Sequence, residues 1–182
     1  FNSNVVIINS QYRTFIKDIS IGNKILSLEF SNDGSSLLVG LESPFMSTLA
    51  MAIYDTTTWQ RIGVNENGKE VSDIGILPGH QIFASANENN GVSEYYINDS
   101  THSIANFDGQ HTTDVTCLDY SPNGQQLVTG GKDGNVFLWD RTSTTVDVSW
   151  QVGFSITDCS ISPDGSQLAW ITDSLLQVRS VP

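Results

Sequence analysis

The sequence predicts an all-β protein made of repeated antiparallel sheets, each with four short strands. Three observations predict this fold class. A turn pattern recurs about every 45 residues, short strand-like runs are bounded by Gly, Asn and Asp, and no stretch of about 11 residues keeps the apolar period of a helix. With 182 residues, of which 38% are apolar and 15% charged, the chain suits one packed domain or a piece of one.

Each repeat is a strand-like run, a turn of the Ser-x-x-Gly type and a second apolar run. Three copies match well, and a fourth is looser: ILSLEFSNDGSSLLVG, VTCLDYSPNGQQLVTG, ITDCSISPDGSQLAWI and VSDIGILPGHQIFASA. The turn glycines lie 45, 45 and 41 residues apart, at Gly34, Gly79, Gly124 and Gly165. Steps of this length are typical of the blades of a β-propeller.

The third repeat divides into four strands, which we expect at Val115–Tyr120, Gln126–Gly130, Asn135–Trp139 and Thr145–Val152. Gly and Asn or Asp stand between them and favour tight turns, because Gly accepts positive φ and Asn or Asp bonds its own backbone. The run Ser36–Leu41 is apolar on both sides, as expected of a strand packed between two neighbouring sheets.

The third repeat also carries a specific signature. His111 precedes the first strand, Thr129 lies in the second, Asp133 lies in the turn before the third, and Trp139-Asp140 ends the third. This arrangement resembles the WD40 repeat, a β-propeller family. The other repeats depart from it at the Trp-Asp position, where they have Tyr54-Asp55, Ile97-Asn98 and Arg179-Ser180.

The resemblance implies a WD40-type propeller of four-stranded antiparallel blades, of which about four of a probable seven are present. We expect one domain with these parts: the third and fourth strands of a preceding blade at 1–19, blade 1 at 20–64, blade 2 at 65–108, blade 3 at 109–153, and blade 4 without its outer strand at 154–182. The first residue is Phe1, which favours a fragment of a longer polypeptide.

A partial propeller leaves apolar faces on its end blades, and soluble monomers tolerate little such surface. The cover is expected from the same chain, from a second copy or from a partner protein. One further alternative is that the segment Tyr12–Ile19 supplies the outer strand of blade 4 and closes a ring of four.

The residues predict no catalytic site, no cofactor and no metal site. In WD40 proteins the equivalents of His111, Thr129, Asp133 and Trp139 form a structural hydrogen-bond network, so we expect the same here rather than a hydrolase triad. Asp73 and Asp158 are expected to face the central channel, where carboxylates can bind a cation, although channel walls are commonly polar for other reasons.

Cys117 and Cys159 lie in the first strands of neighbouring blades, at adjacent strand positions that face opposite sides. We therefore expect two buried free thiols. Unpaired cysteines, together with an apolar run at Val5–Ile8 that lacks the basic start of a secretion signal, favour an intracellular location, either cytoplasmic or nuclear.

The charge of the chain excludes two classes of partner. With a net charge of -12, the chain lacks the excess of positive charge that attracts nucleic acid or anionic membranes. The Gly-rich stretch Gly130–Gly134 lacks the order of a phosphate-binding loop and is explained as a turn.

The best candidate for partner binding is a set of connections expected on one face. Pro44, Phe45 and Met46 place apolar groups in an extended loop, although Phe45 and Met46 can equally fold back over blade 1. Acidic groups nearby favour basic or apolar partner segments. The candidate residues are Glu42, Pro44, Phe45, Met46, Glu66, Lys69, Glu88, Thr112 and Asp114.

By resemblance, the chain is expected to be a non-enzymatic scaffold within a multi-subunit protein complex, docking partner segments on the propeller face. Two alternatives stay open. One is a small-molecule or metal-dependent propeller enzyme, and the other is a purely structural set of blades that completes a larger propeller with another chain.

Overall fold

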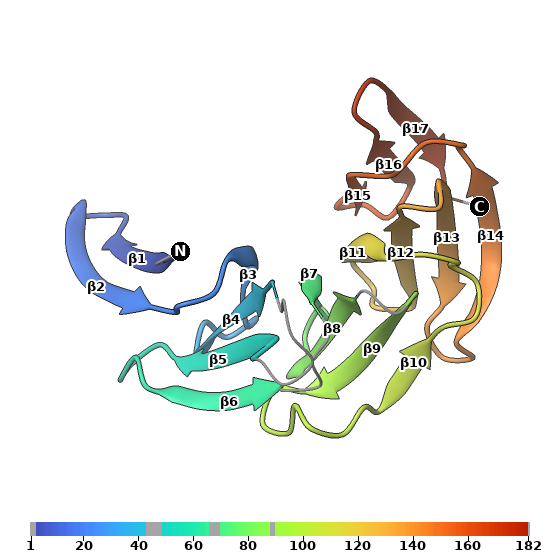
Figure 1. Ribbon diagram of the computed structural model, residues 1–182. Helices are drawn as coiled ribbons and strands as arrows, with labels where there is room; N and C mark the ends of the chain where they lie inside the picture. Colours follow the sequence, from blue (N-terminus) through green and yellow to red (C-terminus); the bar gives the residue numbers. More distant parts are fainter. Residues whose placement is uncertain (1–2, 43–48, 66–69, 88–89, 182) are drawn as a thin grey trace.

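The computed structural model describes residues 3–42, 49–65, 70–87 and 90–181. Within these ranges the chain forms seventeen β-strands and no helix (Figure 1). All strand pairs are antiparallel. The all-β prediction is confirmed.

The strands form five sheets, three of them four-stranded with the strands in chain order. The first sheet has only β1 (Asn4–Asn9) and β2 (Thr14–Ser20). Blade 1 consists of β3 (Ile25–Phe30), β4 (Ser36–Leu41), β5 (Met51–Asp55) and β6 (Arg61–Asn65). Blade 2 consists of β7 (Val71–Ile76), β8 (Ile82–Asn87), β9 (Gly91–Tyr96) and β10 (Ala105–Phe107).

The remaining two sheets follow the same plan. Blade 3 consists of β11 (Val115–Tyr120), β12 (Gln126–Gly131), β13 (Asn135–Asp140) and β14 (Thr145–Gln151). Blade 4 has three strands, β15 (Asp158–Ile161), β16 (Gln167–Ile171) and β17 (Leu176–Ser180).

The first strands of the blades line the inner side of the molecule, where β3 contacts β7, β7 contacts β11, and β11 contacts β15. In Figure 1 the sheets follow one another from blue to red along an arc, and its two ends stay apart. Because β2 pairs with β1, the alternative in which this segment closes a ring of four blades is wrong. The propeller is not closed.

The Ser-x-x-Gly motif forms the turn between the first two strands of a blade. In each of three blades the glycine N–H donates to the serine carbonyl at 2.8 Å, in the pairs Gly34–Ser31, Gly124–Ser121 and Gly165–Ser162. The glycines have φ of 70°, 67° and 73°, a conformation that side-chain-bearing residues rarely adopt. The recurring motif therefore has a recurring backbone cause.

The serine of this turn also holds the acidic residue that follows it. Asp33 accepts hydrogen bonds from the Ser35 N–H at 3.0 Å and the Ser31 hydroxyl at 2.7 Å. These donors lower the pKa of Asp33 to about 2. Asp164, with Ser162 and Ser166, repeats the arrangement in blade 4.

The apolar core lies between neighbouring sheets rather than inside any one of them. All six residues of β4 are buried, as the predicted apolar run Ser36–Leu41 requires. Between blades 3 and 4 a cluster gathers Val128, Leu138, Leu168 and Trp170. Each blade is therefore fixed by the blade beside it.

Candidate functional site

The His111, Thr129, Asp133 and Trp139 side chains lie together in blade 3. Trp139 Nε1 donates to Thr129 Oγ1 at 2.9 Å, and His111 Nε2 lies 2.9 Å from the same oxygen. His111 Nδ1 lies 3.2 Å from both carboxylate oxygens of Asp133. The chain of contacts ties the connection before β11 to the β12–β13 turn.

Backbone donors complete this network. Asp133 accepts the N–H of Thr112 at 2.8 Å and the N–H of Asn135 at 3.0 Å. Burial raises the pKa of Asp133, but these two donors and His111 outweigh burial and lower it. Burial lowers the pKa of His111, although the nearby Asp133 opposes this change. The lowered pKa favours a neutral imidazole.

The geometry is that of a buried structural network. Thr129 is only 1% exposed, and its hydroxyl is occupied by Trp139 and His111, so it presents no nucleophile to solvent. Gly131 leaves room for the network, since a Cβ there would lie 2.6 Å from His111 Nδ1. That constraint on Gly131 was not foreseen from the sequence.

Blade 4 lacks this network at the corresponding place. Trp170 occupies the strand position that Thr129 has in blade 3, as the pairing of Trp170 with Cys159 and of Thr129 with Leu118 shows. Its indole N–H is buried without a hydrogen-bond partner among the described residues. The ring lies instead beside that of Trp150, with centroids 5.5 Å apart and the two planes tilted by 41°.

A second buried network joins blades 2 and 3, and sequence reasoning missed it. Glu94 on β9 is 1% exposed and accepts Arg141 Nε at 2.7 Å and Arg141 Nη2 at 2.9 Å. Tyr120 on β11 donates its hydroxyl to the same carboxylate at 2.7 Å. Burial and the adjacent Glu94 raise the pKa of Tyr120. The signal in the sequence is an acid within the strand-like run GVSEYY.

Asp73 bonds to both neighbouring blades. It accepts hydrogen bonds from the Ser27 hydroxyl of β3 at 3.2 Å and from the Leu118 N–H of β11 at 2.9 Å. Its own strand adds the Ile74 N–H at 2.9 Å. Burial raises the pKa of Asp73 to about 6, although these donors oppose the change.

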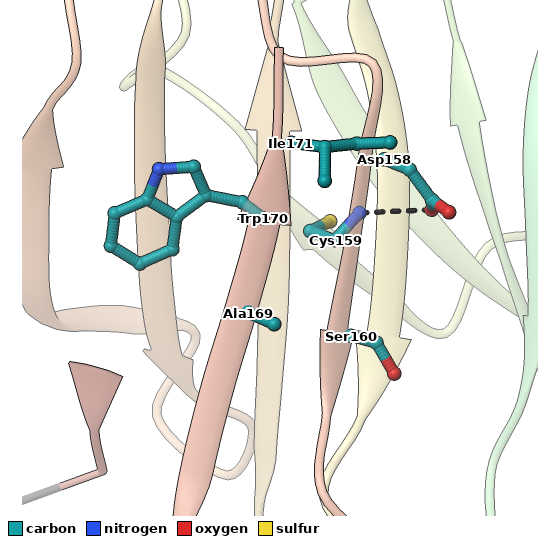
Figure 2. A pocket seen from close by; sticks show the side chains of 6 residues that line it. All are labelled: Asp158, Cys159, Ser160, Ala169, Trp170 and Ile171. Atoms are coloured by element: carbon teal, nitrogen blue, oxygen red, sulfur yellow. Dashed lines mark hydrogen bonds between the residues drawn. The ribbon is translucent and has the colours of Figure 1, made fainter. Parts of the chain in front are cut away.

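The other predicted channel carboxylate, Asp158, accepts the Cys159 N–H at 2.9 Å. Figure 2 shows this bond beside a shallow hollow of about 80 Å³ on blade 4, where the Trp170 indole points away from Asp158 and Ile171. No three side chains of metal-ligating type gather anywhere in the part of the chain that the structure describes.

The prediction of two free thiols is wrong. Cys117 of β11 and Cys159 of β15 form a disulfide, with their Cα atoms 5.8 Å apart. The two residues do occupy adjacent positions that face opposite sides of their own sheets. When two sheets stack, however, the facing side chains come from opposite faces, so the two sulfur atoms meet between blades 3 and 4.

The candidate partner-binding residues divide into a described and an undescribed set. Glu42 lies 3.4 Å from Lys24 Nζ, Asp114 accepts Lys132 Nζ at 2.7 Å, and Thr112 is exposed beside the blade 3 network. The others lie outside the described residues: Pro44, Phe45, Met46, Glu66, Lys69 and Glu88.

We call the side of the blades that carries connections 108–114, 132–134, 152–157 and 172–175 the loop face. On this side a hollow of about 190 Å³ opens between the inner strands of blades 1, 2 and 3. It is lined by Leu26, Glu70, Ser72, Asp114, Val115, Thr116 and Lys132.

Among the residues the structure describes, no helix is long and apolar enough to cross a membrane.

Comparisons with known sequences agree with this architecture. Residues 102–140 match the family model described as WD domain, G-beta repeat. DDB1- and CUL4-associated factor 10 of Xenopus tropicalis is 28% identical over 68% of this chain and 26% of its own length. The LST8 homolog of Drosophila pseudoobscura pseudoobscura is 33% identical over 56% of this chain and 32% of its own length. The chain thus spans about a quarter to a third of these relatives.

Solved structures show the same fold at lower identity. A chain of the Mitotic Checkpoint Complex superposes with a TM-score of 0.79 at 21% identity, covering 94% of this chain and 52% of that one. The β-propeller domain of Cps50 (Swd1) from Myceliophteria thermophila gives 0.80 at 18% identity, covering 100% and 60%. The four-stranded antiparallel blades, the repeat matched at residues 102–140 and these likenesses together support membership of the WD40-repeat β-propeller family.

Proposed function

We propose that the chain is a non-enzymatic interaction platform within a multi-subunit assembly, docking segments of partner proteins on the loop face. The observation that carries this proposal is how firmly the blades beneath that face are held. The blade 3 network fixes the connections around β11 and the β12–β13 turn, and Asp73 joins three inner strands. A rigid frame with loops at its rim suits recognition by a few side chains.

The names of the relatives and neighbours support an assembly role. One is named as an associated factor of DDB1 and CUL4, another as subunit I of translation initiation factor 3, and a solved neighbour belongs to a checkpoint complex. Asp73, one of the two carboxylates considered for a cation site, is engaged by backbone and hydroxyl donors.

Glu42 and the following Pro44, Phe45 and Met46 are the proposed anchors on this face, for a basic or apolar segment. Affinity capture with quantitative mass spectrometry would compare wild type with Phe45→Ala/Met46→Ala. Phe15→Ala/Ile16→Ala, an exposed apolar pair on β2, is the matched control. We expect specific partners to be lost only with the first variant, and unchanged capture would contradict the loop assignment.

A second candidate is a structural set of blades that completes a larger propeller with another chain. At one end a hollow of about 400 Å³ is lined by Val5–Ile8, Leu28, Phe30 and Leu37. At the other end, Leu176 and Val178 are 65% and 46% exposed. Light scattering after gel filtration tests this candidate, because a stable monomer would count against a required cover.

We further propose an intracellular location, cytoplasmic or nuclear, for such an assembly. The name of one relative, subunit I of eukaryotic translation initiation factor 3, supports this location. The Cys117–Cys159 disulfide weighs against it, since disulfides persist mainly in oxidising compartments. Trapping thiols with an alkylating reagent in living cells, followed by non-reducing mass analysis, decides the redox state. Imaging of a tagged full-length protein decides the location directly.

A further inference from the structure

The hollow of about 400 Å³ at the first end of the arc lies between β1 and the first two strands of blade 1 (Figure 1). β1 contributes Val5–Ile8, β3 contributes Leu28 and Phe30, and β4 contributes Leu37. Among the described residues β1 pairs with β2 alone, so no strand of this part of the chain pairs with its other edge. The hollow thus combines an unpaired strand edge with apolar side chains.

The β1–β2 sheet is the outer half of a blade. In its turn, Asn9 Oδ1 accepts the Tyr12 N–H at 2.9 Å. The β13–β14 turn has the same bond, from the Ser143 N–H to Asp140 Oδ1 at 2.8 Å. A register irregularity precedes both turns at the same distance. β1 therefore holds the place of a third strand, and the first two strands of its sheet are not among the described residues.

The side chains that β3 contributes to the hollow are exposed, although their equivalents in blade 3 are buried. Leu28 is 48% exposed and Phe30 is 50% exposed. Leu118 and Tyr120 occupy the same positions before the Ser-x-x-Gly turn of blade 3, and each is 5% exposed. The hollow is thus one side of an interface that the fold contains in complete form between blades 2 and 3.

The first two strands of blade 2 bury these equivalents. One core cluster unites Leu118 and Tyr120 with Leu77 and Ala84 of blade 2. A Cβ on Gly75 of β7 would lie 2.4 Å from Leu118 Cδ1, so β7 and β11 are in direct contact. Two strands in the same position before blade 1 would cover Leu28 and Phe30 in this way.

The contacts between first strands also specify a polar group. The Ile74 N–H of β7 donates to Ser27 Oγ of β3 at 3.2 Å. In the next blade, the Leu118 N–H of β11 donates to Asp73 Oδ2 of β7 at 2.9 Å. Leu28 has the donor's position in β3, as its place in the sheet register shows. A first strand placed before β3 is therefore expected to carry a serine or aspartate that accepts the Leu28 N–H.

The second strand needs a small residue at one position. Gly40, Ala86 and Gly130 each pair with the residue at the acceptor position of their own sheet. A Cβ on Gly40 would lie 2.8 Å from the Val71 carbonyl oxygen, and one on Gly130 would lie 2.6 Å from Ile156 Cγ2. Glycine or alanine at this position lets the following blade approach closely.

A second copy of this chain does not supply the two strands. The pairs β3–β4, β7–β8, β11–β12 and β15–β16 each form the inner half of their own sheet. Blade 4 of another copy would also bring β17, a third strand, to a place that β1 already holds. The hollow therefore fits a hairpin of two strands and no more.

We infer that this hollow is the docking site for a two-stranded β-hairpin of another chain. The second strand of the hairpin pairs antiparallel with the free edge of β1. Its first strand covers Leu28 and Phe30 and accepts the Leu28 N–H with a serine or aspartate, opposite a glycine or alanine. The inference rests on the second candidate function, a set of blades completed by another chain, and it adds the chemistry of that partner.

The chain itself provides a probe for this site. The hairpin of residues 71–87 carries the acceptor Asp73 and the small Ala86, and Val71 pairs with Asn87, so its two ends can be joined. A cyclic peptide of this sequence is titrated into the whole 182-residue chain, and binding is followed by fluorescence polarisation. We expect saturable binding, with slower hydrogen exchange at β1 and unchanged exchange at β17.

Variants of the chain locate the peptide. Leu28→Ala and Phe30→Ala should each weaken binding about tenfold or more. The matched controls are Leu176→Ala and Phe154→Ala, whose side chains are 65% and 67% exposed and do not line the hollow. Equal thermal unfolding temperatures of all variants would show that the losses are not due to unfolding.

Variants of the peptide test the predicted sequence pattern. Asp73→Ala in the peptide removes the acceptor and should weaken binding about tenfold, whereas Asp73→Ser should bind nearly as well as the original. Ala86→Leu adds bulk where the following blade approaches, and should weaken binding at least as much. Equal affinity of all four peptides would overturn the inference.

The outcomes separate the inference from the second candidate function. A partner chain that covers Leu176 and leaves Phe30 exposed would overturn the inference and keep the candidate. A chain that stays monomeric and binds no peptide would overturn both. A dimer that Phe30→Ala dissolves, or slow exchange at the β1 edge in the full-length polypeptide without any partner, would give the hollow another occupant and overturn the inference.

Discussion

Arg141 and Glu94 form a bidentate ion pair across the boundary between blades 2 and 3, with N–O distances of 2.7 and 2.9 Å. The Glu94 side chain is 1% exposed, whereas the Arg141 side chain is 24% exposed. The pair therefore joins two sheets from within, and the hydroxyl of Tyr120 completes the coordination of the carboxylate.

Removing one partner of this ion pair should be costly. Glu94→Gln leaves the guanidinium without its counter-charge, and we expect a loss of about 3 kcal/mol in the free energy of unfolding, measured by urea denaturation. Asp114→Asn breaks the more exposed pair with Lys132 and should cost less than about 1 kcal/mol. Similar losses for the two variants would contradict the role assigned to Glu94.

Disrupting the blade 3 network should lower the free energy of unfolding without changing the proposed partner-binding residues. His111→Ala leaves the Asp133 carboxylate and the Thr129 hydroxyl without their ring partner, and should lower the free energy of unfolding by about 2 kcal/mol. His102, which is highly exposed, provides the control, and His102→Ala should change little. Native-state hydrogen exchange would show whether the loosening is confined to blade 3.

The disulfide should stabilise the last blade. Cys117→Ser/Cys159→Ser opens a cross-link between residues 42 apart, and the chain-entropy relation predicts a loss of about 4 kcal/mol. Thermal melts with and without a reductant should differ for wild type and coincide for the double variant. Two results together would show that the bond does not form in solution. The unfolding temperature of wild type would not change with reductant, and both cysteines would react with an alkylating reagent without prior reduction.

Asp73 should give the stability a distinct pH dependence. Its pKa is raised from 3.8 to about 6 in the folded chain, so the folded state binds a proton more tightly than the unfolded state. The contribution of Asp73 to stability should therefore grow as the pH falls from about 7 to about 4, by roughly 2 kcal/mol. The measurement is the difference in unfolding free energy between wild type and Asp73→Asn across this range. A difference that is constant, or that shrinks on acidification, would refute the assignment.

The features that the sequence predicted are local or periodic. The Ser-x-x-Gly turns depend on bonds such as that from the Gly124 N–H to the Ser121 carbonyl, which span three residues and recur with the repeat. The strand pattern follows from the same period, with bounds that shift by a residue, as at Thr145–Gln151 against the expected Thr145–Val152. The His111 set was found because a family motif links its members.

The features that were missed depend on how separate sheets stack. Whether Cys117 meets Cys159 is decided by the offset between β11 and β15, which neither strand encodes alone. The contact of Glu94 with Arg141 joins residues 47 apart in different blades.

Among the described residues, β17 is the last strand of a three-stranded sheet, so no strand of this part of the chain pairs with its outer edge. A strand edge of this kind is a template for other strands, and Arg179 is the only charged residue within β17 to discourage them. At high concentration, the isolated chain should therefore be prone to edge-to-edge aggregation, and an added lysine on β17 should improve its solubility.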